Sequence, residues 1–217
     1  MNNMIAFIWD LDGTLLDAYG VIVNSLHQIY YEQGIVLNKE EILHDVITES
    51  VPAFTTKIEA KYGVSFATLK DHYSDITHSQ LKDIKLIKHA KEILEITKKY
   101  NVINFIVTHR GVSTDFVLKN LQIYDYFKEI ITSLSGFPRK PNPHAIDYLV
   151  DKYHLDKEKT YYIGDRVLDI ECASNAGIKS IMYLPPSSEA KANGKETYIV
   201  KDLLEVEDII KDVFYKS

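Results

Sequence analysis

The chain alternates between short apolar runs, which are typical of buried strands, and longer stretches with helical spacing of apolar residues. The first run, residues 4–9, ends in Asp-Leu-Asp-Gly-Thr, so we expect a buried strand that stops at turn-forming residues. Similar runs predict strands at residues 102–107, 129–132, 160–163, 178–183 and 197–200. Amphipathic stretches predict helices at residues 83–99, 113–121, 143–153, 167–176 and 202–214. This alternation indicates an α/β fold, a parallel sheet with helices on both faces.

Two residues suggest how individual helices begin. Ser113 is the expected N-cap of the helix that follows the strand at residues 102–107. Pro143 is expected in the first turn of the next helix, where its missing N–H costs nothing.

Residues 19–80 follow a different pattern, because their apolar positions recur at helical spacing and none of their segments resembles a strand. Helices are expected at residues 19–33, 38–47, 51–62 and 66–80. Since strands precede and follow this block, it is an insertion after the first strand. We therefore expect an α/β catalytic core domain of residues 1–17 and 81–217, and an inserted all-helical cap domain of residues 18–80.

The composition is that of an ordinary globular protein, with 217 residues, of which 46% are hydrophobic and 26% charged. The formal net charge is -6 and the chain has no Lys/Arg block, so we expect no nucleic-acid partner. Asp10 and Asp12 interrupt the N-terminal apolar run, so neither a signal peptide nor a membrane partner is expected. A cytoplasmic location and a monomer or weak homodimer follow as expectations, and the single cysteine, Cys172, excludes an internal disulfide.

Polar residues gather where the predicted strands end and in one loop. They are Asp10, Asp12, Thr108, Lys140, Asp165 and Asp169. Parallel strands place their carboxyl ends on one rim, which is where open α/β sheets bind ligands. Two carboxylates two residues apart on an extended segment point the same way, so Asp10 and Asp12 should share a site that needs a cation or a shared proton. Mg²⁺ suits such a site, because it prefers carboxylate oxygen and leaves positions for water and phosphate.

Each of these features alone also has a purely structural explanation. Asp-Gly is a common turn, Thr108 can be a loop hydroxyl, and Lys140 can be a solvated lysine before a proline. Acidic residues after Gly164 suit the start of a helix. Their joint occurrence in this order favours a catalytic site.

Four motifs make the chain similar to the haloacid dehalogenase-like phosphatase superfamily. They are Asp10-Leu-Asp-Gly-Thr-Leu-Leu-Asp17, Ile106-Val-Thr-His-Arg-Gly111, Arg139-Lys-Pro-Asn-Pro143 and Tyr162-Ile-Gly-Asp-Arg-Val-Leu-Asp-Ile-Glu-Cys-Ala-Ser-Asn-Ala-Gly177. The resemblance spans residues 5 to about 183, and the helical insertion falls where that superfamily has a helical cap. The chain most resembles the phosphoglycolate phosphatase-like members, which implies a Rossmann-like core and a cap that closes over the site.

The resemblance implies a hydrolase, a magnesium-dependent phosphatase that acts on a small phosphorylated metabolite with a phosphomonoester bond. It implies that Asp10 attacks phosphorus to form an aspartyl-phosphate, and that Asp12 is the general acid and then the general base. Thr108 is expected to bind phosphoryl oxygens, and Lys140 to neutralise charge on the phosphate and on Asp10.

The resemblance also implies the ligands of the Mg²⁺ cofactor. They are the Asp10 carboxylate, the backbone carbonyl of Asp12 and Asp165, with Asp169 either as a further ligand or as a partner of a ligand. The chain departs from many relatives at His109 and Arg110, where they have small polar residues. Arg110 either helps to bind phosphate or forms a surface ion pair, and we favour the ion pair for it and for the other two arginines, Arg139 and Arg166.

Two other functions stay open. A sugar-phosphate mutase of the same superfamily would pass the phosphoryl group to a second hydroxyl, but those enzymes usually have Glu-Asp where this chain has Gly164-Asp165. A non-enzymatic binding protein on the same fold would be expected to have lost a motif residue, and none is lost. A dehalogenase is disfavoured, because dehalogenase members lack a counterpart of Asp12.

Overall fold

The computed structural model describes residues 4–215 and divides the chain into two compact units. One unit is residues 18–85, and the other is formed by the segments that precede and follow it. The division after residue 85 lies five residues beyond the domain end expected from the sequence at residue 80. Within residues 4–215, none of the helices has the length and apolar character needed to cross a membrane.

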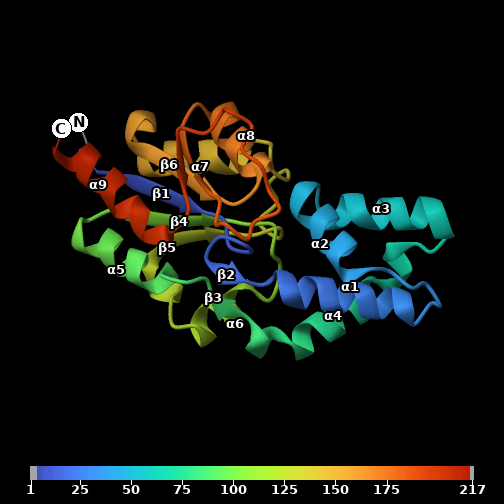
Figure 1. The fold of residues 1–217 in the computed structure, drawn as a ribbon. Helices are drawn as coiled ribbons and strands as arrows, with labels where there is room; N and C mark the ends of the chain where they lie inside the picture. Colours follow the sequence, from blue (N-terminus) through green and yellow to red (C-terminus); the bar gives the residue numbers. More distant parts are fainter. Residues whose placement is uncertain (1–3, 216–217) are drawn as a thin grey trace. The chain divides into compact units, whose positions relative to one another are not determined.

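The larger unit is built on a six-stranded sheet whose neighbouring strands are all parallel (Figure 1). Its strands are β1 (Ala6–Trp9), β4 (Ile103–Val107), β5 (Phe127–Ile131), β6 (Thr160–Gly164), β7 (Lys179–Tyr183) and β8 (Tyr198–Val200). Their order is β5-β4-β1-β6-β7-β8. The parallel α/β core predicted from the sequence is therefore confirmed.

The topological switch point of the sheet lies at β1. After β1 come β4 and then β5 on one side of it, and β6 then returns to its other side. In an open α/β sheet this is where a crevice forms outside the carboxyl ends of the strands. The residues that follow these strands, Asp10, Thr108 and Asp165, are thus brought to the same rim.

Helices cover both faces of the sheet because apolar residues of each strand alternate between the faces. On one face, Ile8, Phe105 and Tyr162 share a buried core with α7 (His144–Tyr153) and α8 (Val167–Ala176). On the other face lie α5 (Ala90–Lys99) and α9 (Val206–Tyr215), which contact each other, whereas α6 (Thr114–Asn120) follows β4. Short 3₁₀ helices, at Leu81–Asp83, Tyr124–Tyr126, Lys157–Lys159 and Leu203–Glu205, complete the connections.

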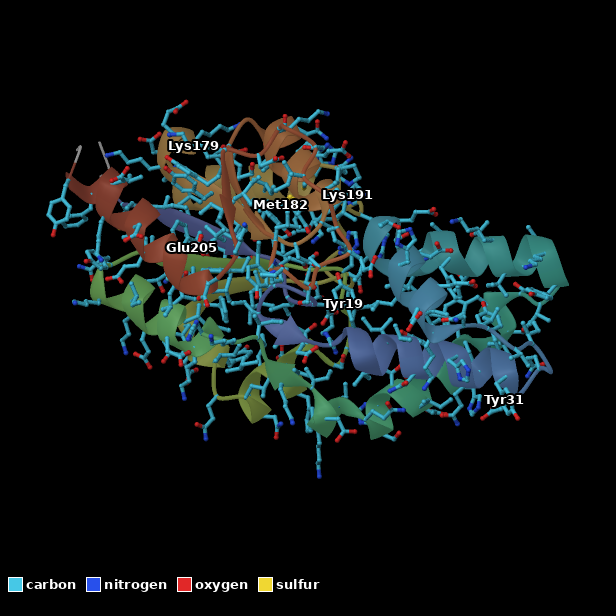
Figure 2. All side chains as sticks on the ribbon, viewed as in Figure 1. Tyr19, Tyr31, Lys179, Met182, Lys191 and Glu205 are labelled. Carbon is cyan, nitrogen blue, oxygen red and sulfur yellow. The ribbon has the colours of Figure 1, made fainter. Side chains whose placement is uncertain are left out.

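Strand β7 is buried along nearly its whole length. Met182 is buried within the core, whereas Lys179 at the start of the strand donates to the backbone carbonyl of Glu158 at 2.6 Å (Figure 2). A strand between two helical layers thus meets solvent only near its ends, which explains its nearly continuous apolar sequence.

The smaller unit consists of helices in the order that the sequence predicts. They are α1 (Tyr19–Tyr31), α2 (Lys39–Thr48), α3 (Val51–Tyr62) and α4 (Phe66–Ser79). Asn38 and Ser50 cap α2 and α3, because their side chains accept hydrogen bonds from the N–H groups of Glu40 and Ala53. Gly63, with a φ of 72°, ends α3 in the left-handed conformation that glycine tolerates best. The helices pack around a core of their own that includes Leu26, Tyr30, Ile42, Phe54 and Ile58.

Some predicted boundaries are wrong. The expected helix at residues 83–99 begins only at Ala90, because Lys85–Leu86 form strand β3, which pairs with β2 (Leu16–Asp17) in a two-stranded sheet. Strands of two residues are too short to give a periodic signal. Ser113 is the N-cap residue of α6, as expected, although its side chain makes no capping hydrogen bond. Pro143 directly precedes α7 rather than lying in its first turn.

A buried polar relay joins β1, β4 and α5. The indole N–H of Trp9 donates to the Asn104 side-chain oxygen at 2.9 Å, and the Asn104 amide donates to the Thr97 hydroxyl at 2.7 Å. All three side chains are buried, so the relay satisfies groups that would be costly to leave unpaired.

We expect Asn104→Ala to lower the free energy of unfolding by about 2–4 kcal/mol, because it opens a cavity and leaves the Trp9 and Thr97 groups without their partner. Urea unfolding followed by the emission of Trp9, the single tryptophan, measures this loss. The exposed Asn120→Ala serves as the control and should change stability by no more than about 0.5 kcal/mol. Equal stability of the two variants would show that the relay contributes nothing.

Candidate active site

The loop after β1 places Asp10 at the centre of the rim. The Asp10 N–H donates to the backbone oxygen of Ile163 at 2.9 Å, so this residue still belongs to the ladder between β1 and β6. Beyond it the chain turns sharply, because Gly13 adopts a φ of 88° and its N–H donates to the carbonyl of Leu16 at 2.8 Å. The turn leaves the Asp10 side chain buried, with an exposed fraction of 2%.

The Lys140 ammonium group occupies the middle of a buried polar cluster. Its three N–H donors match three acceptors, Asp10 Oδ1 at 2.9 Å, Asp169 Oδ1 at 2.6 Å and Tyr162 Oη at 2.9 Å. The Tyr162 hydroxyl in turn donates to the backbone oxygen of Val107, at the end of β4, at 2.6 Å. Lys140 is therefore held in one position by groups from three different segments.

Sequence analysis missed the role of Tyr162. A tyrosine in the middle of a buried strand is the signal that could have revealed it, because a buried hydroxyl needs a hydrogen-bond partner.

The charges of this cluster shift the pKa values of its members. Burial raises the pKa of Asp10, but the positive charges of Lys140 and Arg166 outweigh burial and hold it below its usual value. Burial lowers the pKa of Lys140, but Asp10 and Asp169 outweigh that effect and raise it. Burial, aided by the charge of Asp10, keeps the pKa of Asp169 above its usual value. The lysine is thus charged and Asp10 is ionised, which is the form in which a carboxylate is a nucleophile.

Three carboxylates form a compact group of oxygen donors. Asp10, Asp165 and Asp169 are all buried, and one oxygen of each lies within 4.8 Å of the others. Asp165 accepts a hydrogen bond from the Thr14 hydroxyl at 3.1 Å, and Asp169 Oδ2 accepts one from the Arg166 N–H at 3.1 Å. Carboxylate oxygens are the ligands that Mg²⁺ prefers, so the donor set fits this ion.

Glycine is required at position 164 for this arrangement. A Cβ atom there would lie 2.4 Å from the Cβ of Asp169. The absence of a side chain at Gly164 therefore allows Asp169 to approach the end of β6 and reach Lys140.

The Asp12 carboxylate is not part of the compact group formed by Asp10, Asp165 and Asp169. Its Oδ1 accepts hydrogen bonds from Arg110 Nη2 at 2.7 Å and Nε at 3.0 Å. Arg110 forms an ion pair, as favoured from the sequence, but this pair does not lie on the surface, because the Arg110 side chain is only 6% exposed.

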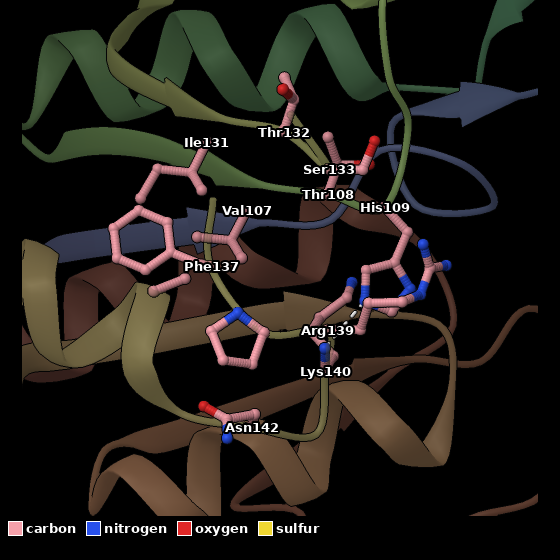
Figure 3. A pocket seen from close by; sticks show the side chains of 12 residues that line it. Val107, Thr108, His109, Ile131, Thr132, Ser133, Phe137, Arg139, Lys140 and Asn142 are labelled. Atoms are coloured by element: carbon pink, nitrogen blue, oxygen red, sulfur yellow. Dashed lines mark hydrogen bonds between the residues drawn. The ribbon is translucent and has the colours of Figure 1, made fainter. Parts of the chain in front are cut away.

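Thr108 and Lys140 border a pocket on the rim, seen in Figure 3. The pocket is also lined by His109, Ser133 and Arg139. The Lys140 N–H donates to His109 Nε2 at 2.9 Å, the dashed contact in Figure 3. Burial and the charges of Lys140 and Arg139 lower the pKa of His109 to about 3, so its imidazole is neutral and acts as an acceptor.

Thr108 itself is fixed by its backbone and by its hydroxyl. Its N–H donates to the carbonyl of Ile131 at 3.0 Å, and its Oγ1 accepts from the N–H of Arg110 at 3.1 Å. The hydroxyl hydrogen can still be donated to an anion.

The structure brings Asp10, Lys140, Asp165 and Asp169 together in one buried group, whereas Asp12 is held by its separate contact with Arg110.

The chain is similar to known proteins over nearly its whole length. It is 23% identical to the pyrophosphatase PpaX of Oceanobacillus iheyensis, over 95% of this chain and 97% of that protein. It is 28% identical to the phosphoglycolate phosphatase of Aliivibrio fischeri, over 82% of each chain. Among solved structures, a predicted phosphoglycolate phosphatase from Haemophilus somnus matches the fold with a TM-score of 0.84 and 21% identity, over 96% of this chain and 99% of that chain.

The family model described as haloacid dehalogenase-like hydrolase matches residues 7–183, which include Asp10, Asp12, Thr108, Lys140, Asp165 and Asp169. Because this match covers most of the sequence, the chain belongs to the haloacid dehalogenase-like hydrolase family.

Proposed function

We propose that this chain is a magnesium-dependent phosphatase that hydrolyses small phosphomonoesters through an aspartyl-phosphate on Asp10. The main support is the contact of 2.9 Å between Asp10 Oδ1 and Lys140 Nζ in a buried cluster that also contains Asp165 and Asp169. A buried carboxylate kept ionised beside a cation and further carboxylates is suited to attack phosphorus. Relatives named phosphoglycolate phosphatase agree with this reaction class.

In the first step, the Asp10 carboxylate attacks phosphorus, and the bond between phosphorus and the ester oxygen breaks. Asp12 gives a proton to the departing alcohol oxygen. In the second step, water attacks the phosphorus of the aspartyl-phosphate, Asp12 takes a proton from this water, and inorganic phosphate leaves. Thr108 donates a hydrogen bond to a phosphoryl oxygen, while Lys140 neutralises negative charge on the transferred group.

The charge of the site favours the binding of a metal ion. Three buried carboxylates, Asp10, Asp165 and Asp169, face the cationic side chains of Lys140 and Arg166. A phosphate dianion would therefore enter a site that is already negative. Asp10, Asp165 and the backbone carbonyl of Asp12 would hold Mg²⁺, with Asp169 as a further ligand or as a partner of a ligand. The ion would supply positive charge that attracts and polarises the phosphoryl group.

The helical unit of residues 18–85 is proposed to act as a cap that excludes water during the reaction. A small metabolite suits a site that closes in this way. The relatives named above include a pyrophosphatase as well as phosphoglycolate phosphatases, so pyrophosphate and phosphoglycolate both belong in the first set of substrates to test.

Hydrolysis is favoured over phosphoryl transfer to a second hydroxyl. The related mutases usually have glutamate where this chain has Gly164, and a Cβ at this position would lie 2.4 Å from Asp169 Cβ. The position that distinguishes the two reactions is thus occupied by a glycine that the site needs for its own geometry.

We expect Asp10→Asn to lower phosphate release by at least about 10³-fold, because the amide is a poor nucleophile. Release of phosphate from p-nitrophenyl phosphate and from a panel of phosphorylated metabolites measures the effect. The exposed Asp151→Asn makes the same chemical change on α7 and should retain full activity. Circular dichroism checks that both variants fold, and turnover by a folded Asp10→Asn protein would exclude the aspartyl-phosphate.

Chelation of divalent ions with EDTA should abolish phosphate release, and added Mg²⁺ should restore it. Asp165→Asn removes one proposed ligand, so we expect half-maximal activity at a Mg²⁺ concentration about 10–100-fold higher than for the wild type. Magnesium titrations of both proteins, with Asp151→Asn for comparison, provide the measurement. Undiminished activity in EDTA would contradict a role for the metal.

A hexose 1-phosphate distinguishes the hydrolase from the mutase. If the chain acts on this compound, we expect free phosphate and hexose as the products, because water accepts the phosphoryl group. Phosphorus NMR of the reaction mixture identifies the products, with buffer alone as the control. Accumulation of hexose 6-phosphate would establish the mutase instead.

A further inference from the structure

The Arg110 guanidinium group contacts Asp12 and Ser113, the residue that precedes the next helix, at the same time. Its Nε and Nη2 donate to Asp12 Oδ1 at 3.0 and 2.7 Å, and its Nη1 donates to the Ser113 hydroxyl at 2.9 Å. The arginine side chain is 6% exposed and that of Asp12 is 20% exposed. This ion pair is thus shielded from water, unlike a surface pair, and joins residues 98 positions apart.

The backbone of Arg110 is fixed as firmly as its side chain. Its N–H donates to Thr108 Oγ1 at 3.1 Å, and its carbonyl accepts from the N–H of Ser133 at 3.1 Å. Ser113, which holds the guanidinium, directly precedes α6. Each of these contacts comes from the rim of the sheet, so Arg110 has little freedom to move relative to β4.

We infer that Arg110 is a positioning residue that holds the Asp12 carboxylate in the orientation needed to exchange a proton with the leaving group. This inference depends on the proposed phosphatase function. Among residues 4–215, both hydrogen bonds to the Asp12 carboxylate end on Oδ1, which leaves Oδ2 to face the leaving oxygen. A carboxylate anchored through one oxygen loses rotational freedom before the substrate arrives, and such preorganisation accelerates the transfer.

Arginine is better suited than lysine to this role. The planar guanidinium reaches Asp12 through two nitrogens and Ser113 through the third, so it fixes both distance and orientation. An ammonium group is a point charge without this geometry. Arg110→Lys therefore keeps the charge and removes the orientation.

The test compares two leaving groups. An alkyl alcohol leaves only if its oxygen is protonated, whereas p-nitrophenolate is a stable anion and leaves without a proton. Because kcat/KM reports the steps up to departure of the leaving group, it isolates the proton transfer from Asp12. We expect Arg110→Gln to lower kcat/KM about 10–100-fold for the best alkyl monoester of the panel, and less than about threefold for p-nitrophenyl phosphate.

Three further variants separate positioning from charge and from a general loss of structure. Arg110→Lys should behave like Arg110→Gln, with a larger loss of kcat/KM for the alkyl monoester than for p-nitrophenyl phosphate. Ser113→Ala should show the same kind of loss at a smaller size. Lys152→Gln removes an ion-paired cation from the same unit, between α7 and Glu129, and should leave both values unchanged. Ser113→Ala removes only the hydrogen bond from Arg110 Nη1 and leaves both members of the ion pair in place. It therefore provides the test if Arg110→Gln fails to fold.

A double-mutant cycle shows whether Arg110 acts through Asp12. In an Asp12→Asn background, Arg110→Gln should cost less than about threefold for the alkyl substrate, because the group that it positions is already lost. An equal loss on both substrates, or a full additional loss in the Asp12→Asn background, would show that Arg110 binds the phosphate directly and would overturn the inference. No loss in any variant would overturn it as well.

The proposed function is tested separately by the wild type and by Asp10→Asn. Wild-type turnover that Asp10→Asn abolishes retains the phosphatase, whatever the Arg110 variants do. A folded wild-type protein that releases no phosphate from any substrate would overturn the phosphatase and this inference together.

Discussion

The buried ammonium group of Lys140 is the contact on which the rest of the site depends. It lies between Asp10 and Asp169, at 2.9 and 2.6 Å from their oxygens, where water is excluded. Removal of such charges from water costs several kcal/mol per ion, so each charge is tolerable only while its partners stay in place. The loop after β1, the loop before α7 and the start of α8 must therefore meet within the reach of one side chain. Tyr162 supplies the third acceptor and completes the hydrogen bonds of the lysine.

The sheet makes this meeting possible. Its parallel strands end on one rim, and the position of β1 between β4 and β6 places the carboxyl end of β1 beside those of both neighbours. Two glycines then permit close approach, Gly13 by its positive φ and Gly164 by its lack of a side chain. The polar side chains of the site thus lie at one edge of an apolar sheet, and the helices on both faces keep that sheet rigid.

Two aspartates that are close in sequence have different electrostatic environments. Asp10 is buried beside Lys140, whereas Asp12 is partly exposed and is paired with Arg110. The proposed reaction uses this separation, because the nucleophile must stay ionised while the proton carrier must change its protonation state. A site in which both carboxylates shared one cation would couple these two requirements.

The sequence by itself determined the α/β core, the helical insertion and most of the residues on the rim. These features follow from hydrophobic periodicity and from short motifs, which are local properties of the chain. The sequence did not determine the strand order, the late start of α5, the hydrogen bond from Lys140 to the Tyr162 hydroxyl, or the pairing of Arg110 with Asp12. Such contacts join segments that are far apart in the sequence. Only the packing of the sheet and its loops decides which buried polar groups become partners, because many pairings satisfy the same local pattern.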